Sequence, residues 1–147
     1  MSDWVKIGMS AVAMTIIAEV VRMVEAVLTM GYYTDPAYFA VWSKIMMPGA
    51  GPPPAEFYYY SVTFALVTWF IFGFVYEKLG VSIHEKNPIR KGLRFGALVF
   101  LLTGISGTLT MHLLVNLPAG LLVSWTISAL LLYLIGGLVA GKLIKPI

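Results

Sequence analysis

The sequence predicts an all-α integral membrane protein, a bundle of four transmembrane helices. Three observations point to it: the composition, the long apolar segments and the distribution of basic residues. Of the 147 residues, 59% are hydrophobic and 12% are charged, whereas soluble domains average about 45–50% apolar and about 25% charged residues. This number of charged residues is too small to cover the surface of a soluble domain of this size. We therefore expect lipid to surround most of the chain.

Four segments have the length and composition of transmembrane helices. They cover approximately residues 4–30, 55–76, 92–115 and 119–143. Each has at least about 20 residues, enough to cross a hydrocarbon core about 30 Å thick. In lipid the backbone amides have to be satisfied within each segment, which requires helices rather than open strands. We therefore expect residues 1–147 to form a single four-span membrane domain.

The basic residues predict the orientation. Eight of the ten fall on one side of this arrangement: Lys6, then Lys78, Lys86, Arg90, Lys91 and Arg94, and finally Lys142 and Lys145. Lys44 lies on the other side, and Arg22 lies within the first span. Because cytoplasmic loops carry an excess of lysine and arginine, we expect a multi-pass protein of the cell membrane with both termini in the cytoplasm.

The loop between the second and third spans carries a basic cluster. Lys86, Arg90, Lys91 and Arg94 stand close together there. Such a cluster beside a membrane span is typical of contact with anionic lipid headgroups. No basic domain accompanies it, so nucleic acid is not expected as a partner.

The chain also shows signs of an internal repeat. A shift of 64 residues lays the second span on the fourth, with nine identities in a window of 26. A shift of 81 lays the Leu-Thr-Met of residues 28–30 on that of residues 109–111. We interpret this as two tandem helical hairpins in parallel orientation, with halves at 1–79 and 85–143. The alternative is a chance resemblance between apolar helices.

The first outer loop predicts a short interfacial helix. Asp35 followed by Pro36 is typical of an N-cap with proline at the first helical position. The helix would cover residues 37–47 and lie at the membrane surface, ending at the proline- and glycine-rich residues 48–54. A lid over a cavity or a docking surface for a partner are the alternatives.

The first span contains three charged residues, Glu19, Arg22 and Glu25. Steps of three residues place them on one flank of a helix, so we expect Arg22 to pair with both carboxylates. The cluster could bind a proton or an ion, or it could be a structural ion-pair network, since charges in a membrane need partners. Hydroxyl side chains in the spans could extend a polar lining: Thr15, Thr63, Thr68, Thr103 and Ser106.

Small residues recur at four-residue spacing in the third and fourth spans. They are Gly92, Gly96, Gly136, Gly137, Ala140 and Gly141. In lipid, small residues let two helices approach closely, and dispersion forces then hold them together. This pattern predicts a helix-packing surface, either within the chain or towards a second subunit.

Metal, cofactor and catalytic sites are not predicted. The chain has no cysteine, which excludes thiolate chemistry and disulfides. His112 and Met111 could contribute to a copper site, but methionine is a common apolar filler, so we expect no metal and no cofactor. None of the common catalytic motifs occurs, so we do not expect an enzyme.

These features favour a non-catalytic accessory subunit of a homo- or hetero-oligomeric membrane complex. The glycine-lined helix faces and the lack of an extramembrane domain support self-association or membership in a larger complex. The alternative is a small transporter or channel that uses Glu19, Arg22 and Glu25 for proton- or ion-coupled binding.

Overall fold

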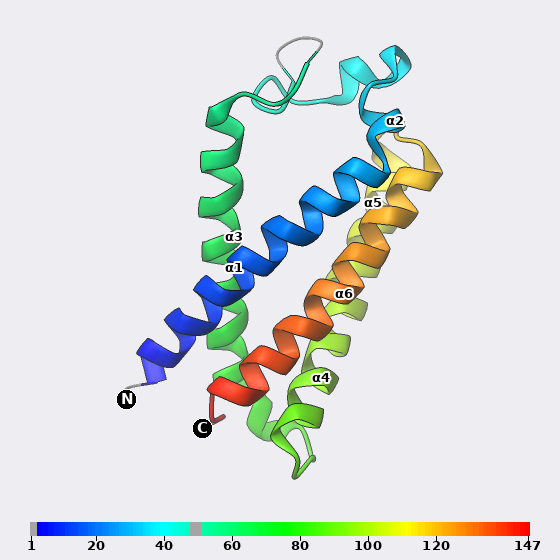
Figure 1. Ribbon diagram of the computed structural model, residues 1–147. Coiled ribbons are helices and arrows are strands. Elements are labelled where there is room, and N and C mark those ends of the chain that lie inside the picture. The colour runs from blue at the N-terminus through cyan, green and yellow to red at the C-terminus, as the bar shows by residue number, and fades with distance from the viewer. Residues whose placement is uncertain (1–2, 48–50) are drawn as a thin grey trace.

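The computed structural model describes residues 3–47 and 51–147, and in these ranges all regular structure is helical (Figure 1). The predicted all-α class is therefore confirmed. The predicted helix end at residues 48–54 lies partly outside the described residues, because 48–50 are not among them.

Three helical rods have the length and composition to cross a membrane. The first is α3 (Ala55–Leu79) with the short 3-10 helix η2 (Gly80–Ser82). The second is continuous through α4 (Pro88–Val99), the π-helical η3 (Phe100–Ile105) and α5 (Ser106–Leu114). The third is α6 (Ala119–Leu143). They correspond to the spans predicted at 55–76, 92–115 and 119–143.

The first predicted span forms α1 (Asp3–Leu28), followed by the short α2 (Met30–Tyr33). At 26 residues α1 is as long as the other rods, but it is not among the three that composition alone qualifies. Besides Glu19, Arg22 and Glu25, α1 carries Asp3 and Lys6. Whether α1 can cross a membrane therefore depends on where those side chains lie.

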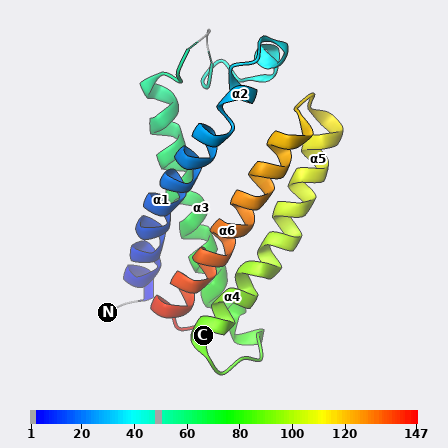
Figure 2. The same cartoon turned by 45° about the vertical axis from the view of Figure 1, so that its right-hand side comes forward.

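The helices pack as two close pairs joined through α1. α4 lies along α6, and α1 crosses α3 and also contacts α6 (Figures 1 and 2). Aromatic rings fill the centre: Phe72 of α3 meets Phe95 of α4 at 5.1 Å between centroids, and Trp69 meets Tyr133 of α6 at 6.0 Å. These edge-on and tilted contacts link α3 to the α4–α6 pair.

The sequence predicts one continuous helix for residues 92–115. The second rod is continuous, but it is not α-helical throughout. Residues Phe100–Ile105 form a π-helix, in which each turn is wider and holds more residues than a turn of α-helix. Gly104 lies beside the Phe100 ring, and a Cβ atom there would come within 2.5 Å of it. The wide turn thus leaves room for a buried aromatic ring and changes the face that α5 presents to its neighbours.

The predicted helix at residues 37–47 is wrong in type and length. A 3-10 helix, η1, covers Pro36–Val41, and the Asp35 carboxylate caps it by accepting from the Ala37 amide at 2.9 Å, as the Asp-Pro pattern predicted. The helix stops because Trp42 is extended, at φ −73° and ψ 143°. This conformation stacks the Trp42 indole on Tyr33, with 5.2 Å between ring centroids.

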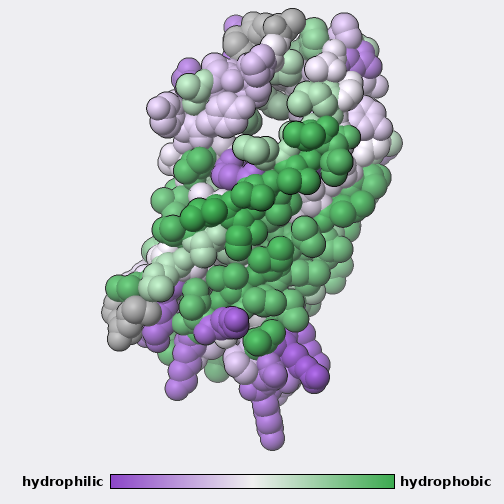
Figure 3. Space-filling view, in the orientation of Figure 1, coloured by the Kyte–Doolittle hydropathy of each residue, from purple (hydrophilic) through white to green (hydrophobic). Residues whose placement is uncertain are grey.

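The basic segments gather at one end of the molecule. Both chain ends and the connection from α3 to α4 lie there (Figure 1), and the Ile147 amide donates to the Glu77 carbonyl at 3.0 Å. The space-filling view shows an apolar band across the middle and strongly hydrophilic groups at this end (Figure 3). The polarity of the surface is therefore that of a protein crossing an apolar layer.

The buried hydroxyl of Tyr76, near this end, leads to a prediction about stability. The Tyr76 side chain is 0% exposed, and its hydroxyl has no hydrogen-bond partner among the described residues. Because an unsatisfied buried hydroxyl costs free energy, Tyr76→Phe should leave stability unchanged or raise it by about 1 kcal/mol. Thermal unfolding in detergent measures this. Tyr133→Phe is the control, since Thr103 bonds that hydroxyl at 3.1 Å; an equal loss in both variants would contradict the prediction.

Candidate functional site

The charged residues of α1 contact two different neighbouring helices. Six residues separate Glu19 from Glu25, which turns their side chains about 120° apart around the helix axis. Glu19 faces α3 and Glu25 faces α6. The expectation that Arg22 pairs with both carboxylates is wrong: its Nη1 lies 3.3 Å from Glu19 Oε1, and no ion pair joins it to Glu25 among the described residues.

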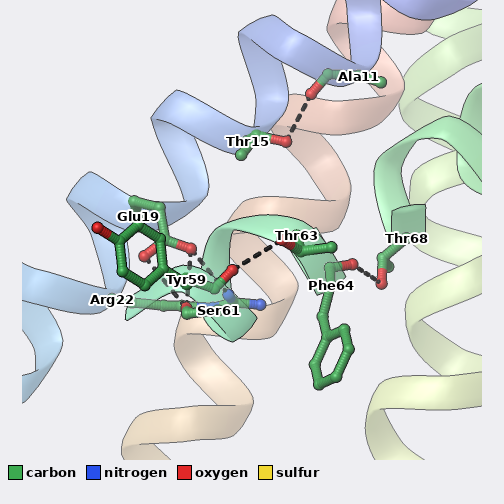
Figure 4. Close-up of polar contacts among 9 residues, drawn as sticks. All are labelled: Ala11, Thr15, Glu19, Arg22, Tyr59, Ser61, Thr63, Phe64 and Thr68. Atoms are coloured by element: carbon green, nitrogen blue, oxygen red, sulfur yellow. Dashed lines mark hydrogen bonds and ion pairs between the residues drawn. The ribbon is translucent and has the colours of Figure 1, made fainter. Parts of the chain in front are cut away.

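Glu19 forms a polar contact between α1 and α3. The Ser61 hydroxyl of α3 lies 3.0 Å from Glu19 Oε1 and 3.2 Å from Oε2, and Figure 4 shows both residues turned towards each other with Arg22 beside them. The Glu19 side chain is 27% exposed and that of Arg22 is 49% exposed. Arg22 reaches back along α1 towards Glu19, away from the nearer end of the helix.

An opening lies beyond this contact. Past Ser61, α1 leans towards α6 while α3 stands apart (Figures 1 and 2), and the space-filling view shows the molecule hollowed there, with hydrophilic groups at the margin (Figure 3). From Ala55 to Phe64, α3 has no buried residue. Apart from the Ser61 contact, the described chain therefore leaves the outer half of α3 largely uncovered, and Arg22 lies next to this region.

Two shallow surface grooves occur elsewhere, along α3. One is lined by Trp4, Phe70, Ile71 and Phe74, and the other by Leu66, Val67, Phe70 and Ile71. Both linings consist of apolar and aromatic side chains. These grooves therefore fit hydrocarbon rather than a polar solute.

Glu25 is the more deeply buried carboxylate, at 8% exposure. Its Oε1 accepts from the hydroxyls of Ser124 at 2.7 Å and Thr29 at 2.9 Å, and its Oε2 from Tyr33 at 3.3 Å. The Trp125 indole N–H in turn donates to the Tyr33 hydroxyl at 2.8 Å. Hydroxyl groups from α2, from α6 and from the turn between α1 and α2 thus stabilise Glu25 and tie these three helices together at their outer ends.

Tyr33, in α2 beyond the end of α1, is held in its protonated form. Burial raises the pKa of Tyr33 to about 12, and the neighbouring Glu25 carboxylate acts in the same direction. A neutral phenol keeps its proton for donation. The bond to Glu25 is therefore available throughout the physiological pH range.

The predicted polar lining is not assembled into one surface. Thr15, Thr63 and Thr68 donate to carbonyls of their own helices, at 2.8, 2.8 and 2.7 Å (Figure 4). Thr103 bonds the Val99 carbonyl and the Tyr133 hydroxyl, and Ser106 is exposed at the start of α5. None of these hydroxyls bonds Glu19 or Glu25 among the described residues. Two of the hydroxyls that do bond them from other helices, those of Ser61 and Ser124, were recognisable in the sequence as polar groups in apolar spans, but their partners were not.

The small residues lie in contacts within the chain. A Cβ atom on Gly92 would overlap the Gly137 carbonyl, and one on Gly137 would overlap the Gly92 carbonyl. Gly96 abuts the Tyr133 carbonyl and Gly141 the Pro88 carbonyl, while Gly136 faces the Trp69 ring. Ala140 is 0% exposed. Backbone-to-backbone contact therefore joins α4 to α6.

The basic loop presents most of its charges to the surroundings. Lys86 and Arg90 are exposed and Lys91 is half-buried. Arg94 lies 3.4 Å from Glu85 Oε2 and donates to the His84 carbonyl at 3.4 Å. This arrangement leaves Lys86, Arg90 and Lys91 available for other anions.

Acid should loosen this loop. The Asn87 backbone N–H, with help from the Arg94 guanidinium, holds the pKa of Glu85 below its usual range. A lowered folded-state pKa means that the stabilisation is present above the unfolded pKa, about 4.3, and is lost as pH falls through the folded value. Protection of the loop amides, measured as hydrogen exchange relative to the intrinsic exchange rate at each pH, should therefore fall on acidification below about pH 4, and Glu85→Gln should abolish that dependence. An unchanged acid response in Glu85→Gln would contradict the assignment.

The outer end of α5 carries the two residues weighed for copper. Met111 and His112 are both exposed. Among the described residues, no group of three or more His, Cys, Asp or Glu side chains could hold a metal ion.

The chemistry of the site is that of polar contacts between helices. Glu19 and Glu25 each bind a hydroxyl on a neighbouring helix, and among the described residues the Arg22 side chain bonds Glu19 alone. Comparisons with known protein families, with characterised proteins and with solved structures give no match to this chain.

Proposed function

We propose that this chain is a non-catalytic subunit of a homo- or hetero-oligomeric membrane assembly, and that α1 is its fourth membrane span. The placement of the α1 side chains supports the fourth span. Glu25 is buried against α6, on the side of α1 away from exposed apolar groups such as Val12, Ile16 and Val20, and Glu19, at the edge of that apolar face, bonds α3. An apolar outer face with polar groups turned inward suits a helix packed in lipid.

The charge distribution supports a multi-pass topology with both termini in the cytoplasm. The basic segments share one end of the molecule, which the excess of lysine and arginine on cytoplasmic loops assigns to that side. Lys86, Arg90 and Lys91 would then meet anionic headgroups. The helix η1, at the opposite end, would lie at the outer membrane surface.

A single observation carries the assembly proposal: Arg22 is half exposed beside an uncovered stretch of α3. A charge facing lipid at membrane depth costs at least about 2.5–3.5 kcal/mol. Arg22 bends towards Glu19 rather than towards the nearer membrane surface, so it does not escape that cost by extending to the headgroups. A neighbouring subunit over the opening would enclose the guanidinium and the bare outer half of α3 together.

Mass measurement after purification in mild detergent tests this proposal. The expected result is a defined complex, either several copies of the chain or the chain with another membrane protein. Arg22→Leu should leave the individual chain folded, because Arg22 makes a single side-chain bond in the part of the chain that the structure describes, but should weaken the complex. A wild-type mass equal to one copy of the chain would contradict the proposal.

The opening beside Glu19 also supports a second candidate, a small transporter or channel. In that case water would fill the hollow between α1 and α3 and reach Glu19, which is partly exposed. Purified protein in liposomes would then take up a proton- or ion-coupled solute, and Glu19→Gln would abolish uptake. Uptake by a single copy would favour this candidate over the subunit.

A further inference from the structure

We propose that two copies of this chain pair through the opening between α1 and α3, with Arg22 of each copy bonding Glu19 of the other. This inference rests on the proposed role in a membrane assembly and names the surface and the partner. The surface consists of Glu19, Arg22 and the outer half of α3, residues 55–64.

Unused bonding capacity marks this surface. A guanidinium has five N–H donors, and Arg22 uses one of its nitrogens, Nη1, in a single 3.3 Å contact with Glu19 Oε1. Glu19 Oε2 receives only the Ser61 hydroxyl, at 3.2 Å, among the described residues. Each copy therefore offers both a cation with free donors and a carboxylate with free acceptor positions.

The pair is complementary to itself. In a twofold-symmetric dimer the same patch faces its own copy, so a donor and an acceptor one helical turn apart can satisfy each other across the axis. Two copies inserted with the same orientation also hold these groups at the same depth in the membrane. A different partner would need its own carboxylate and its own cation at that depth, and lipid chains supply neither.

The surroundings fit a helix rather than water. The outer half of α3 has no buried residue, and its exposed side chains are largely aromatic or apolar, including Tyr59 at 74% exposure and Phe64 at 63%. Covering them with a second copy would exclude competing water from the ion pairs. Charge-assisted bonds between Arg and carboxylate are strongest in such an environment.

A charge-reversal experiment tests the contact between copies. Two differently tagged forms of the full chain, one with Glu19→Arg and one with Arg22→Glu, are expressed alone and together in membranes. Wild-type copies should co-purify with each other, each single variant should fail to pair with itself, and the two variants should pair with one another. Within each variant copy, residues 19 and 22 carry like charges and repel each other. Restored pairing between the two variants can therefore come only from bonds between the copies. Lys44→Glu, in the outer loop, is the control and should pair like wild type.

Cross-linking gives a readout that does not depend on the charges. The chain has no cysteine, so a single introduced one reports alone. Tyr58 lies three residues before Ser61, on the same face of α3 and closer to the outer end, so Tyr58→Cys should form a disulfide-linked dimer in membranes. Leu131→Cys, exposed on α6, should not.

The outcomes separate this inference from the proposed function. A hetero-complex that contains one copy of the chain would overturn the pairing and retain the subunit role. A larger complex that cross-links through Leu131→Cys but not Tyr58→Cys, or a mixed pair that fails to form, would also overturn only the pairing. A single free copy in mild detergent would overturn both.

Discussion

Replacing Gly92 with alanine should lower the free energy of unfolding by about 1–3 kcal/mol, the typical cost of overpacking. The added Cβ atom would meet the Gly137 carbonyl oxygen and carbon, which are backbone atoms that no rotamer change can move. Relief would require α4 and α6 to separate along their whole contact. Thermal unfolding in detergent, followed by circular dichroism, measures the loss.

The matched control is an alanine substitution at a glycine that has free space around its Cα atom. Gly107 lies in α5, and a Cβ atom there would have no neighbour within 4 Å. Because alanine favours a helix over glycine by about 1 kcal/mol, Gly107→Ala should leave stability unchanged or raise it. Opposite signs at the two positions would locate the effect in the α4–α6 contact. An equally mild effect at Gly92 would show that the two backbones do not touch.

Removing the Ser124 hydroxyl should produce the second large effect. Ser124→Ala deletes the shortest bond to Glu25, 2.7 Å, and leaves a buried carboxylate short of a donor. Hydrogen bonds to charged groups contribute about 1.5–3 kcal/mol, so we expect a loss in this range. The same thermal unfolding measures it, and fluorescence of Trp125, which bonds Tyr33 in this network, should change as well.

A double-mutant cycle separates the bond from other effects of the substitution. In a Glu25→Gln background the carboxylate charge is gone, so Ser124→Ala should cost markedly less. Ser128→Ala, one turn further along α6, is the control, because Ser128 makes no side-chain hydrogen bond to another helix among the described residues. Additive losses from Glu25→Gln and Ser124→Ala would contradict a direct bond.

Several local features were predictable because they depend on neighbouring residues alone. The three apolar rods follow from runs of hydrophobic residues, and the cap of η1 follows from Asp35 and Pro36. The length of η1 did not follow, because Trp42 leaves the helix to stack on Tyr33, a contact beyond its near neighbours. The π-helix at Phe100–Ile105 was also missed, since a change in hydrogen-bond register leaves no periodic pattern of residue types.

By itself, the sequence determined that this is an all-helical chain with long apolar helices and basic residues gathered at one end, because hydrophobicity and charge are properties of the residues themselves. Only the tertiary structure decided that Glu19 bonds Ser61 and Glu25 bonds Ser124. It also decided that Gly92 and Gly137 meet inside the chain. Periodicity places a side chain on a face of its helix; which helix covers that face depends on how all the helices pack together.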